Sequence, residues 1–192
     1  MGKLMTCLSG LTLAFAIGSH VTADPFGIDL QADTPQSLGC KHVEGLNHYC
    51  ATLPHSHPDM TGYILRYHDE LGYCSIMASG KEISTNRFGA SLRAQFEAIK
   101  EQLSLKYGEP GVSDDLMKGS VWTAPEDWMI GLMKKERYLN ALFLPGEESP
   151  FEAIRLQTSA TGLEKGRVSV LYIGRSLEKC IELEKQDRSN SF

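Results

Sequence analysis

The chain contains no apolar run of the length that a membrane-spanning helix requires. Its longest apolar stretch covers residues 4–18 and is interrupted by Thr6, Ser9 and Thr12. A helix needs about 20 predominantly apolar residues to cross the hydrocarbon core of a bilayer. The sequence therefore predicts a protein without a transmembrane anchor.

Several catalytic and cofactor-binding motifs are also absent. The sequence has no Gly-x-Ser-x-Gly nucleophile elbow and no His-Glu-x-x-His zinc motif. It has neither a P-loop nor a Gly-x-Gly-x-x-Gly fingerprint, which excludes these two types of phosphate-binding loop. It has no Cys-x-x-Cys pair, which excludes a thioredoxin-type redox motif and a zinc knuckle. We therefore assign no catalytic residue, no metal ligand and no cofactor from the sequence.

Positive charge is scarce. The 192 residues include 19 Lys and Arg but 24 Asp and Glu, for a net charge of −5 at pH 7. No run of basic residues is longer than Lys134-Lys135. Nucleic acids and anionic membranes attract basic patches. The acidic composition therefore predicts a protein that binds neither.

The first 23 residues have the pattern of a secretory signal peptide. Lys3 is the only charge before the apolar segment, and small residues occupy Val21 and Ala23. We predict cleavage between Ala23 and Asp24, a mature net charge of −6 after loss of Lys3, and a location in the periplasm or outside the cell. The Ser-Leu-Gly-Cys sequence at 37–40 looks like a lipoprotein acylation site but lies far from the apolar run, so we expect no lipid anchor.

Export determines how the remaining cysteines are interpreted. Four stay in the mature chain after Cys7 leaves with the leader: Cys40, Cys50, Cys74 and Cys180. An even number in an oxidising compartment predicts two disulfides, with three possible connectivities. Loop economy favours Cys40–Cys50, and the need to tether a chain terminus favours Cys74–Cys180.

Two helices are predicted from spacing and end signals. Four apolar residues at intervals of three or four, including Leu92 and Phe96, predict a helix over about residues 88–107. Gly108, with a proline two residues later, is the signature of its end. A Thr-Ala-Pro-Glu capping sequence predicts a second helix over about residues 125–135.

Alternation of apolar and polar residues predicts the strands. Residues 61–78 form a predicted β-hairpin with a turn near Gly72. Further strands are expected at 26–30, 49–53, 138–144, 151–158 and 168–173, with a polar connection at 111–119 and a last short helix around Cys180.

This order of elements predicts an α+β fold. The sheet or sheets should be mostly antiparallel and built from the hairpin and a three-strand meander, with two principal helices packed on one side. We assign residues 24–186 to a single domain, or to two small halves, 24–110 and 111–186, that share a core. Residues 187–192 are expected to form a flexible C-terminal tail.

All five histidines of the predicted mature chain lie in one segment: His42, His48, His55, His57 and His68. His55 and His57 are followed by Met60, and imidazole and thioether groups suit copper or zinc. A closed metal site needs several convergent ligands with supporting contacts, and flanking prolines favour an exposed loop here. Metal binding by the segment 42–68 is therefore an alternative function, without assigned ligands.

The sequence favours an exported, disulfide-stabilised, non-enzymatic protein that binds another macromolecule of the envelope or the extracellular space. Trp122 stands in a polar-edged loop and is a candidate contact residue. A hydrolase whose Ser, His and carboxylate meet only in the folded chain is a second alternative. The partner, the ligand and the oligomeric state stay open.

Overall fold

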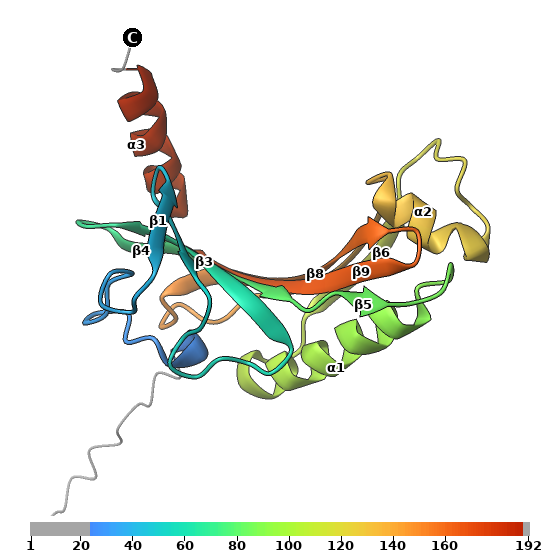
Figure 1. Ribbon diagram of the computed structural model, residues 1–192, viewed down its shortest axis with the longest axis horizontal. Coiled ribbons are helices and arrows are strands. Elements are labelled where there is room, and N and C mark those ends of the chain that lie inside the picture. The colour runs from blue at the N-terminus through green and yellow to red at the C-terminus, as the bar shows by residue number, and fades with distance from the viewer. Residues whose placement is uncertain (1–23, 190–192) are drawn as a thin grey trace, which may run out of the picture.

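Nine strands form one sheet in the computed structural model, which describes residues 24–189 (Figure 1). The order is β1-β2-β3-β4-β9-β8-β7-β6, with β5 paired to β9 off this path, and all of these pairings are antiparallel. The strands are β1 (Lys41–Glu44), β2 (Asn47–Cys50), β3 (Met60–His68), β4 (Gly72–Gly80), β5 (Ile83–Ser84), β6 (Gly111–Leu116), β7 (Arg137–Phe143), β8 (Phe151–Gly162) and β9 (Lys165–Gly174). The expected α+β fold with a mostly antiparallel sheet is confirmed.

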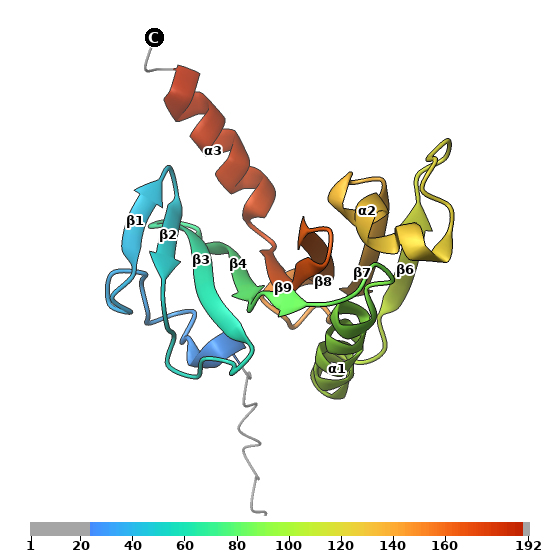
Figure 2. The ribbon, with the colours of Figure 1, turned by 45° about the vertical axis from the view of Figure 1, so that its right-hand side comes forward.

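Helices and short turns complete the fold. They are α1 (Ala90–Tyr107), α2 (Trp128–Met133), α3 (Leu177–Ser189) and two 3-10 turns (Pro25–Gly27 and Pro125–Asp127). α1 lies along one face of β8 and β9, whereas α3 rises from the opposite side of the sheet (Figure 1). α3 leaves the end of β9 beside β4 and continues past residue 186, where the sequence predicted a flexible tail (Figure 2).

The pairing of β4 with β9 joins the two halves of the chain. Ile76 lies opposite Tyr172, and Ala78 lies opposite Val170. All four side chains are buried, and they belong to the same hydrophobic cluster as the apolar stripe of α1. One sheet and one core therefore span both halves.

The start of α1 requires glycine. Gly89 precedes the helix with a left-handed φ of 71°, and Asn86 Oδ1 accepts a hydrogen bond from the Ala90 amide at 3.2 Å. A Cβ atom at Gly89 would lie 2.3 Å from the ring of Trp128. Only glycine therefore allows the first turn of α1 to pack directly against α2.

Two expectations about strands are wrong. Residues 26–30 are not a strand, because Phe26 and Gly27 both adopt left-handed φ values and turn the chain. The predicted polar connection 111–119 contains a strand, Gly111–Leu116, paired with β7. Its polar composition conceals it, because pairing with a neighbouring strand outweighs a weak intrinsic preference.

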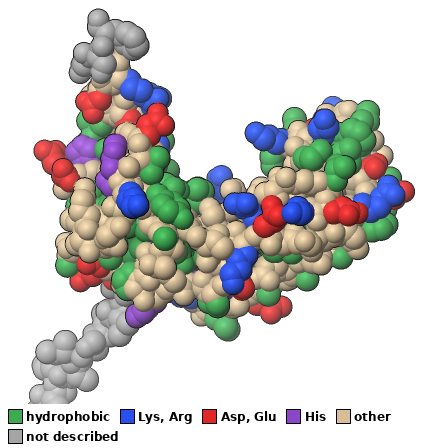
Figure 3. Space-filling view, in the orientation of Figure 1, with side chains coloured by type: hydrophobic (Ala, Val, Ile, Leu, Met, Phe, Trp, Pro, Cys, Tyr) green, Lys and Arg blue, Asp and Glu red, His purple; other side chains and the backbone are tan. Residues whose placement is uncertain are grey.

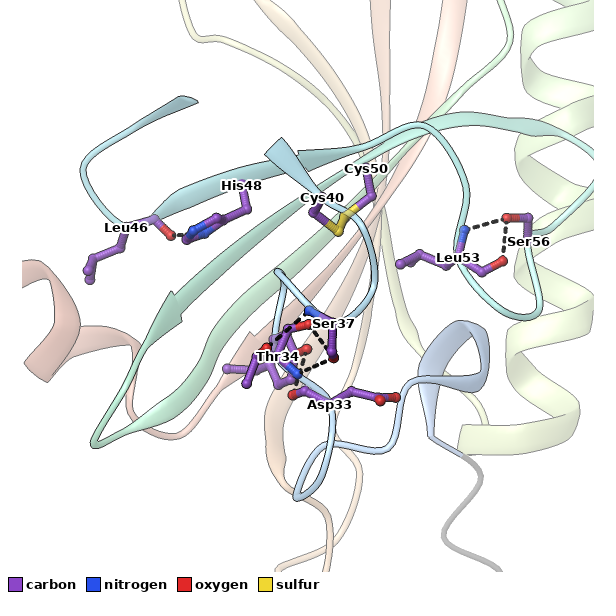
Figure 4. The surroundings of a disulfide bond; sticks show 10 residues. Asp33, Thr34, Ser37, Cys40, Leu46, His48, Cys50, Leu53 and Ser56 are labelled. Atoms are coloured by element: carbon purple, nitrogen blue, oxygen red, sulfur yellow. Dashed lines mark hydrogen bonds between the residues drawn. A yellow bond between two sulfur atoms is a disulfide. The ribbon is translucent and has the colours of Figure 1, made fainter. Parts of the chain in front are cut away.

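Two disulfides fix the fold at both ends. Cys40 joins Cys50 across 10 residues at the open end of the β1–β2 hairpin (Figure 4). Cys74 joins Cys180 across 106 residues and ties α3 to β4. This is the pairing that loop economy and terminal tethering favour.

Replacement of Phe96 tests whether the apolar stripe of α1 is packed in the core. Its side chain is 0% exposed, so Phe96→Ala should lower the free energy of unfolding by about 3–5 kcal/mol through lost burial and a residual cavity. Chemical denaturation measures the change. Leu105→Ala on the same helix, at a site 92% exposed, is the control and should change stability by less than about 0.5 kcal/mol. Equal effects at the two sites would contradict the packing described.

The two disulfides should contribute unequally. In the chain-entropy model, closing the short loop contributes about 3 kcal/mol and closing the long loop about 5 kcal/mol. The variant with Cys74 and Cys180 replaced by Ala should therefore unfold at lower denaturant concentration than the variant with Cys40 and Cys50 replaced. The reverse order of midpoints would show that loop closure in the unfolded chain does not dominate.

Candidate binding surface

A row of side chains crosses six strands on the face of the sheet opposite α1. Each member is the registered partner of the next, from β2 through β3, β4, β9 and β8 to β7. We call it the open-face row: Tyr49, Ile64, Met77, Leu171, Arg155 and Leu142. Tyr49 is 40% exposed and Leu142 38%, and the three aliphatic side chains between them are partly exposed.

The neighbouring row, one residue along each strand, points the other way. It consists of Cys50, Tyr63, Ala78, Val170, Leu156 and Ala141, and all six are buried. Successive side chains of a strand point to opposite faces. The sheet thus has one face packed on the core and one face, the open face, that solvent reaches.

Three arginines share the open face. Arg66 lies two residues from Ile64 on β3, Arg155 belongs to the row itself, and Arg167 lies four residues before Leu171 on β9. Residues two or four apart on a strand point to the same side. In an acidic protein, the open face therefore combines apolar side chains with positive charge.

The three arginines differ in their partners. Arg66 pairs with Glu184 of α3 at 3.1 Å. Arg167 is partly buried, and its Nε has no hydrogen-bond partner in the described residues. The pKa of the Glu82 carboxyl is lowered mainly by a hydrogen bond from Lys165, and the nearby charge of Arg167 lowers it further. Arg155 is exposed, and its side chain makes no hydrogen bond or ion pair within residues 24–189. Its guanidinium, between Leu171 and Leu142 near one end of the row, is available to a partner.

α3 borders the open face on one side. The disulfide to Cys74 holds its first turns, and Glu184 holds its middle. Glu184 Oε1 accepts a hydrogen bond from the Leu46 amide at 2.9 Å, while Oε2 pairs with Arg66. The surface is hollowed between α3 and the end of the molecule that carries α2, with hydrophobic and basic side chains along the hollow (Figure 3). These contacts therefore fix the position of α3 beside the open face.

The structure separates the histidines that the sequence placed together. His57 Nε2 lies 2.9 Å from Gln102 Oε1 on α1, and its Nδ1 accepts a hydrogen bond from the Asp59 amide. His55 instead packs against Gly27, and His68 Nδ1 accepts from the backbone of its own turn. No group of three His, Cys, Asp or Glu in residues 24–189 could hold a metal ion.

No Ser-His pair of the kind found in a hydrolytic triad is joined by a hydrogen bond in residues 24–189. No histidine there is hydrogen-bonded to a serine, threonine or cysteine side chain. A cavity of about 700 Å³ is lined by acidic groups, including Asp29, Glu147 and Glu148. Its lining includes no histidine, lysine or cysteine, and the Arg175 guanidinium is engaged by the carbonyls of Gly146 and Ser149. No hydrogen bond in the described residues joins a lining carboxylate to the hydroxyl of Ser149 or Ser176.

The predicted cleavage site adjoins this cavity. Ala23 lies outside the described residues, and Asp24 lines the cavity. Burial raises the pKa of the Asp24 carboxyl, and the neighbouring charge of Asp29 raises it further.

The predicted contact residue Trp122 is only half-buried, near Gly131 of α2. Trp128 is buried, and its indole N–H donates to Asp114 at 3.2 Å. Sequence reasoning missed the open-face row because β4 and β9 carry apolar residues on both faces. Such strands look covered on both sides, and only the register shows which side is open.

None of the described helices is long and apolar enough to cross a bilayer. Comparisons with protein-family models, with curated proteins and with solved structures gave no match.

Glu184 should hold α3 in place. Its side chain is only 11% exposed, and Glu184→Ala leaves the Leu46 amide and Arg66 without their carboxylate. We expect a loss of about 1–3 kcal/mol in unfolding free energy and faster hydrogen exchange at the Leu46 amide. Glu182→Ala, on the exposed side of α3, is the matched control and should change neither. Unaltered exchange at Leu46 would show that the contact does not restrain the helix.

Proposed function

We propose that this protein is an exported, non-enzymatic binding protein that docks another protein on its open face. The contacting surface of that partner combines apolar and acidic side chains. The observation that carries the proposal is the open-face row, in which apolar side chains from five strands lie in line with Arg155, whose side chain has no partner in the described residues.

The apolar part of the row supports docking. Apolar side chains that line up across registered strands make a continuous surface rather than scattered contacts. Contiguous apolar surface on a folded protein is typical of interaction sites. Tyr49 at one end adds a large amphipathic ring of the type enriched at protein interfaces.

The charge on the row supports an acidic partner. Arg155 has no partner in the described chain, so its guanidinium is free to form a bidentate pair with a carboxylate. Arg66 and Arg167 lie on the same face, where Glu184 pairs with the first and the Glu82 carboxylate lies near the second. The Arg155 charge favours an acidic partner and disfavours basic ones.

Export is supported by two independent features of the chain. The N-terminal sequence has the charge, apolar run and small residues of a signal peptide. The remaining four cysteines form two disulfides, as expected in an oxidising compartment. The hydrogen bonds of the described histidines go to amide groups and carbonyl oxygens, and none goes to a serine, threonine or cysteine side chain. These contacts favour a binding role.

Site-specific photo-cross-linking tests the proposed surface. A benzoylphenylalanine at Leu142 samples the open face, and one at the exposed Leu105 of α1 samples a remote surface. Each variant is exposed to envelope and secreted proteins of the source cells. We expect a discrete adduct from position 142 alone, with Asp and Glu in the cross-linked peptide of the partner.

Charge reversal separates specific docking from capture by chance. Arg155→Glu should weaken the adduct by about tenfold or more, because it places like charges together in the interface. Lys118→Glu makes the same charge change on an exposed loop and should leave the adduct unaltered. No adduct at position 142, equal adducts at both positions, or equal effects of the two charge variants would contradict the proposal.

A further inference from the structure

Two histidines face each other across the first hairpin. β1 and β2 place His42 directly opposite His48, and the centroids of the two rings are 5.3 Å apart. His48 is 7% exposed and is held on the core side of the sheet beside Leu65. His42 is exposed. The pair therefore consists of one fixed ring and one that solvent reaches.

Hydrogen bonds fix the protonation pattern of both rings. His42 Nε2 lies 2.9 Å from the Gly45 carbonyl oxygen, and His48 Nδ1 lies 3.2 Å from the Leu46 carbonyl oxygen. A carbonyl only accepts, so each of these nitrogens carries the hydrogen. In a neutral imidazole the other nitrogen then holds a lone pair. These nitrogens, His42 Nδ1 and His48 Nε2, make no hydrogen bond within residues 24–189.

This is the supporting arrangement of metal-ligating histidines. Such residues nearly always donate their second ring N–H to a backbone carbonyl, a carboxylate or water. The donation fixes the tautomer and increases the basicity of the ligating nitrogen. Both His42 and His48 have this contact already and keep their second nitrogen without a hydrogen bond in the described residues, whereas His57 has both nitrogens engaged, by Gln102 and by the Asp59 amide.

The hairpin is fixed at both ends. The Cys40–Cys50 disulfide closes the end next to the histidines, on the same side of the hairpin as His48 (Figure 4). At the turn, Glu184 of α3 binds the Leu46 amide. The spacing of the two strands that carry the histidines is therefore set before any ligand arrives. The rings meet edge to face at 73°, and the exposed His42 can adjust at little cost.

We propose that His42 and His48 bind one divalent late transition-metal ion through Nδ1 and Nε2 respectively, with water in the remaining positions. Imidazole nitrogens suit copper and zinc, and Cu²⁺ should bind more tightly than Zn²⁺ because of the general affinity order of divalent metals. Two protein ligands leave the ion open to solvent, so it exchanges readily. The site is independent of the open face.

Calorimetric titration of the full mature chain with Cu²⁺ and with Zn²⁺, in a buffer that does not chelate metals, tests the site. We expect one ion per chain. His42→Ala should weaken binding by about tenfold or more through loss of one ligand. The double variant His55→Ala/His57→Ala is the matched control and should bind as the parent does. The copper electron-spin resonance spectrum should show nitrogen coordination that His42→Ala reduces.

His42 is the informative position because it is exposed, and circular dichroism verifies the fold of the variant. Replacement of the buried His48 is made with Gln, which retains a side-chain donor for the Leu46 carbonyl, and should also weaken binding. Absence of binding by the parent chain would overturn the proposal. Binding that survives His42→Ala, or that is lost in the His55/His57 double variant, would overturn it as well.

Discussion

The register in the middle of the central strands is the constraint on which the rest of this structure depends. The β3–β4 and β8–β9 pairings shift register only near their ends, and between these shifts each residue faces its partner without a change of phase. The pairing of Ala78 with Val170 carries that phase between the two halves of the chain. A slip of one residue at this junction would turn every side chain of one half to the opposite face. The same register therefore creates both the buried core and the open face.

Local sequence patterns predicted correctly those helices and strands whose structure depends on their own residues alone. The spacing of Leu92 and Phe96 predicted α1, because only one face of that helix is apolar. The hairpin and the later strands followed from alternation. β6 was not predicted, because its polar residues form a strand only by pairing with β7. Residues 26–30 were wrongly predicted as a strand, because an apolar pattern does not reveal the left-handed φ values of Phe26 and Gly27.

The candidate sites were harder to predict, for a physical reason. The sequence drew attention to His55 and His57 because they are neighbours along the chain, yet the structure gives each its own surroundings. His42 and His48 are six residues apart and meet only because a turn folds one strand onto the other. The open face was concealed in the same way. Ile76 and Met77 are both apolar, and only the register shows that one is buried and the other partly exposed.

The two ends of this sheet have a consequence for how copies of the chain behave together. A terminal strand presents unpaired backbone groups that a strand from another molecule can join. At one end β1 is only four residues long and its register is interrupted between His42 and Glu44. At the other end β6 places Asp115 at the margin, where an incoming strand would have to accommodate its charge. Both margins therefore oppose the addition of a strand from a second copy, and with it the edge-to-edge growth that leads to fibrils.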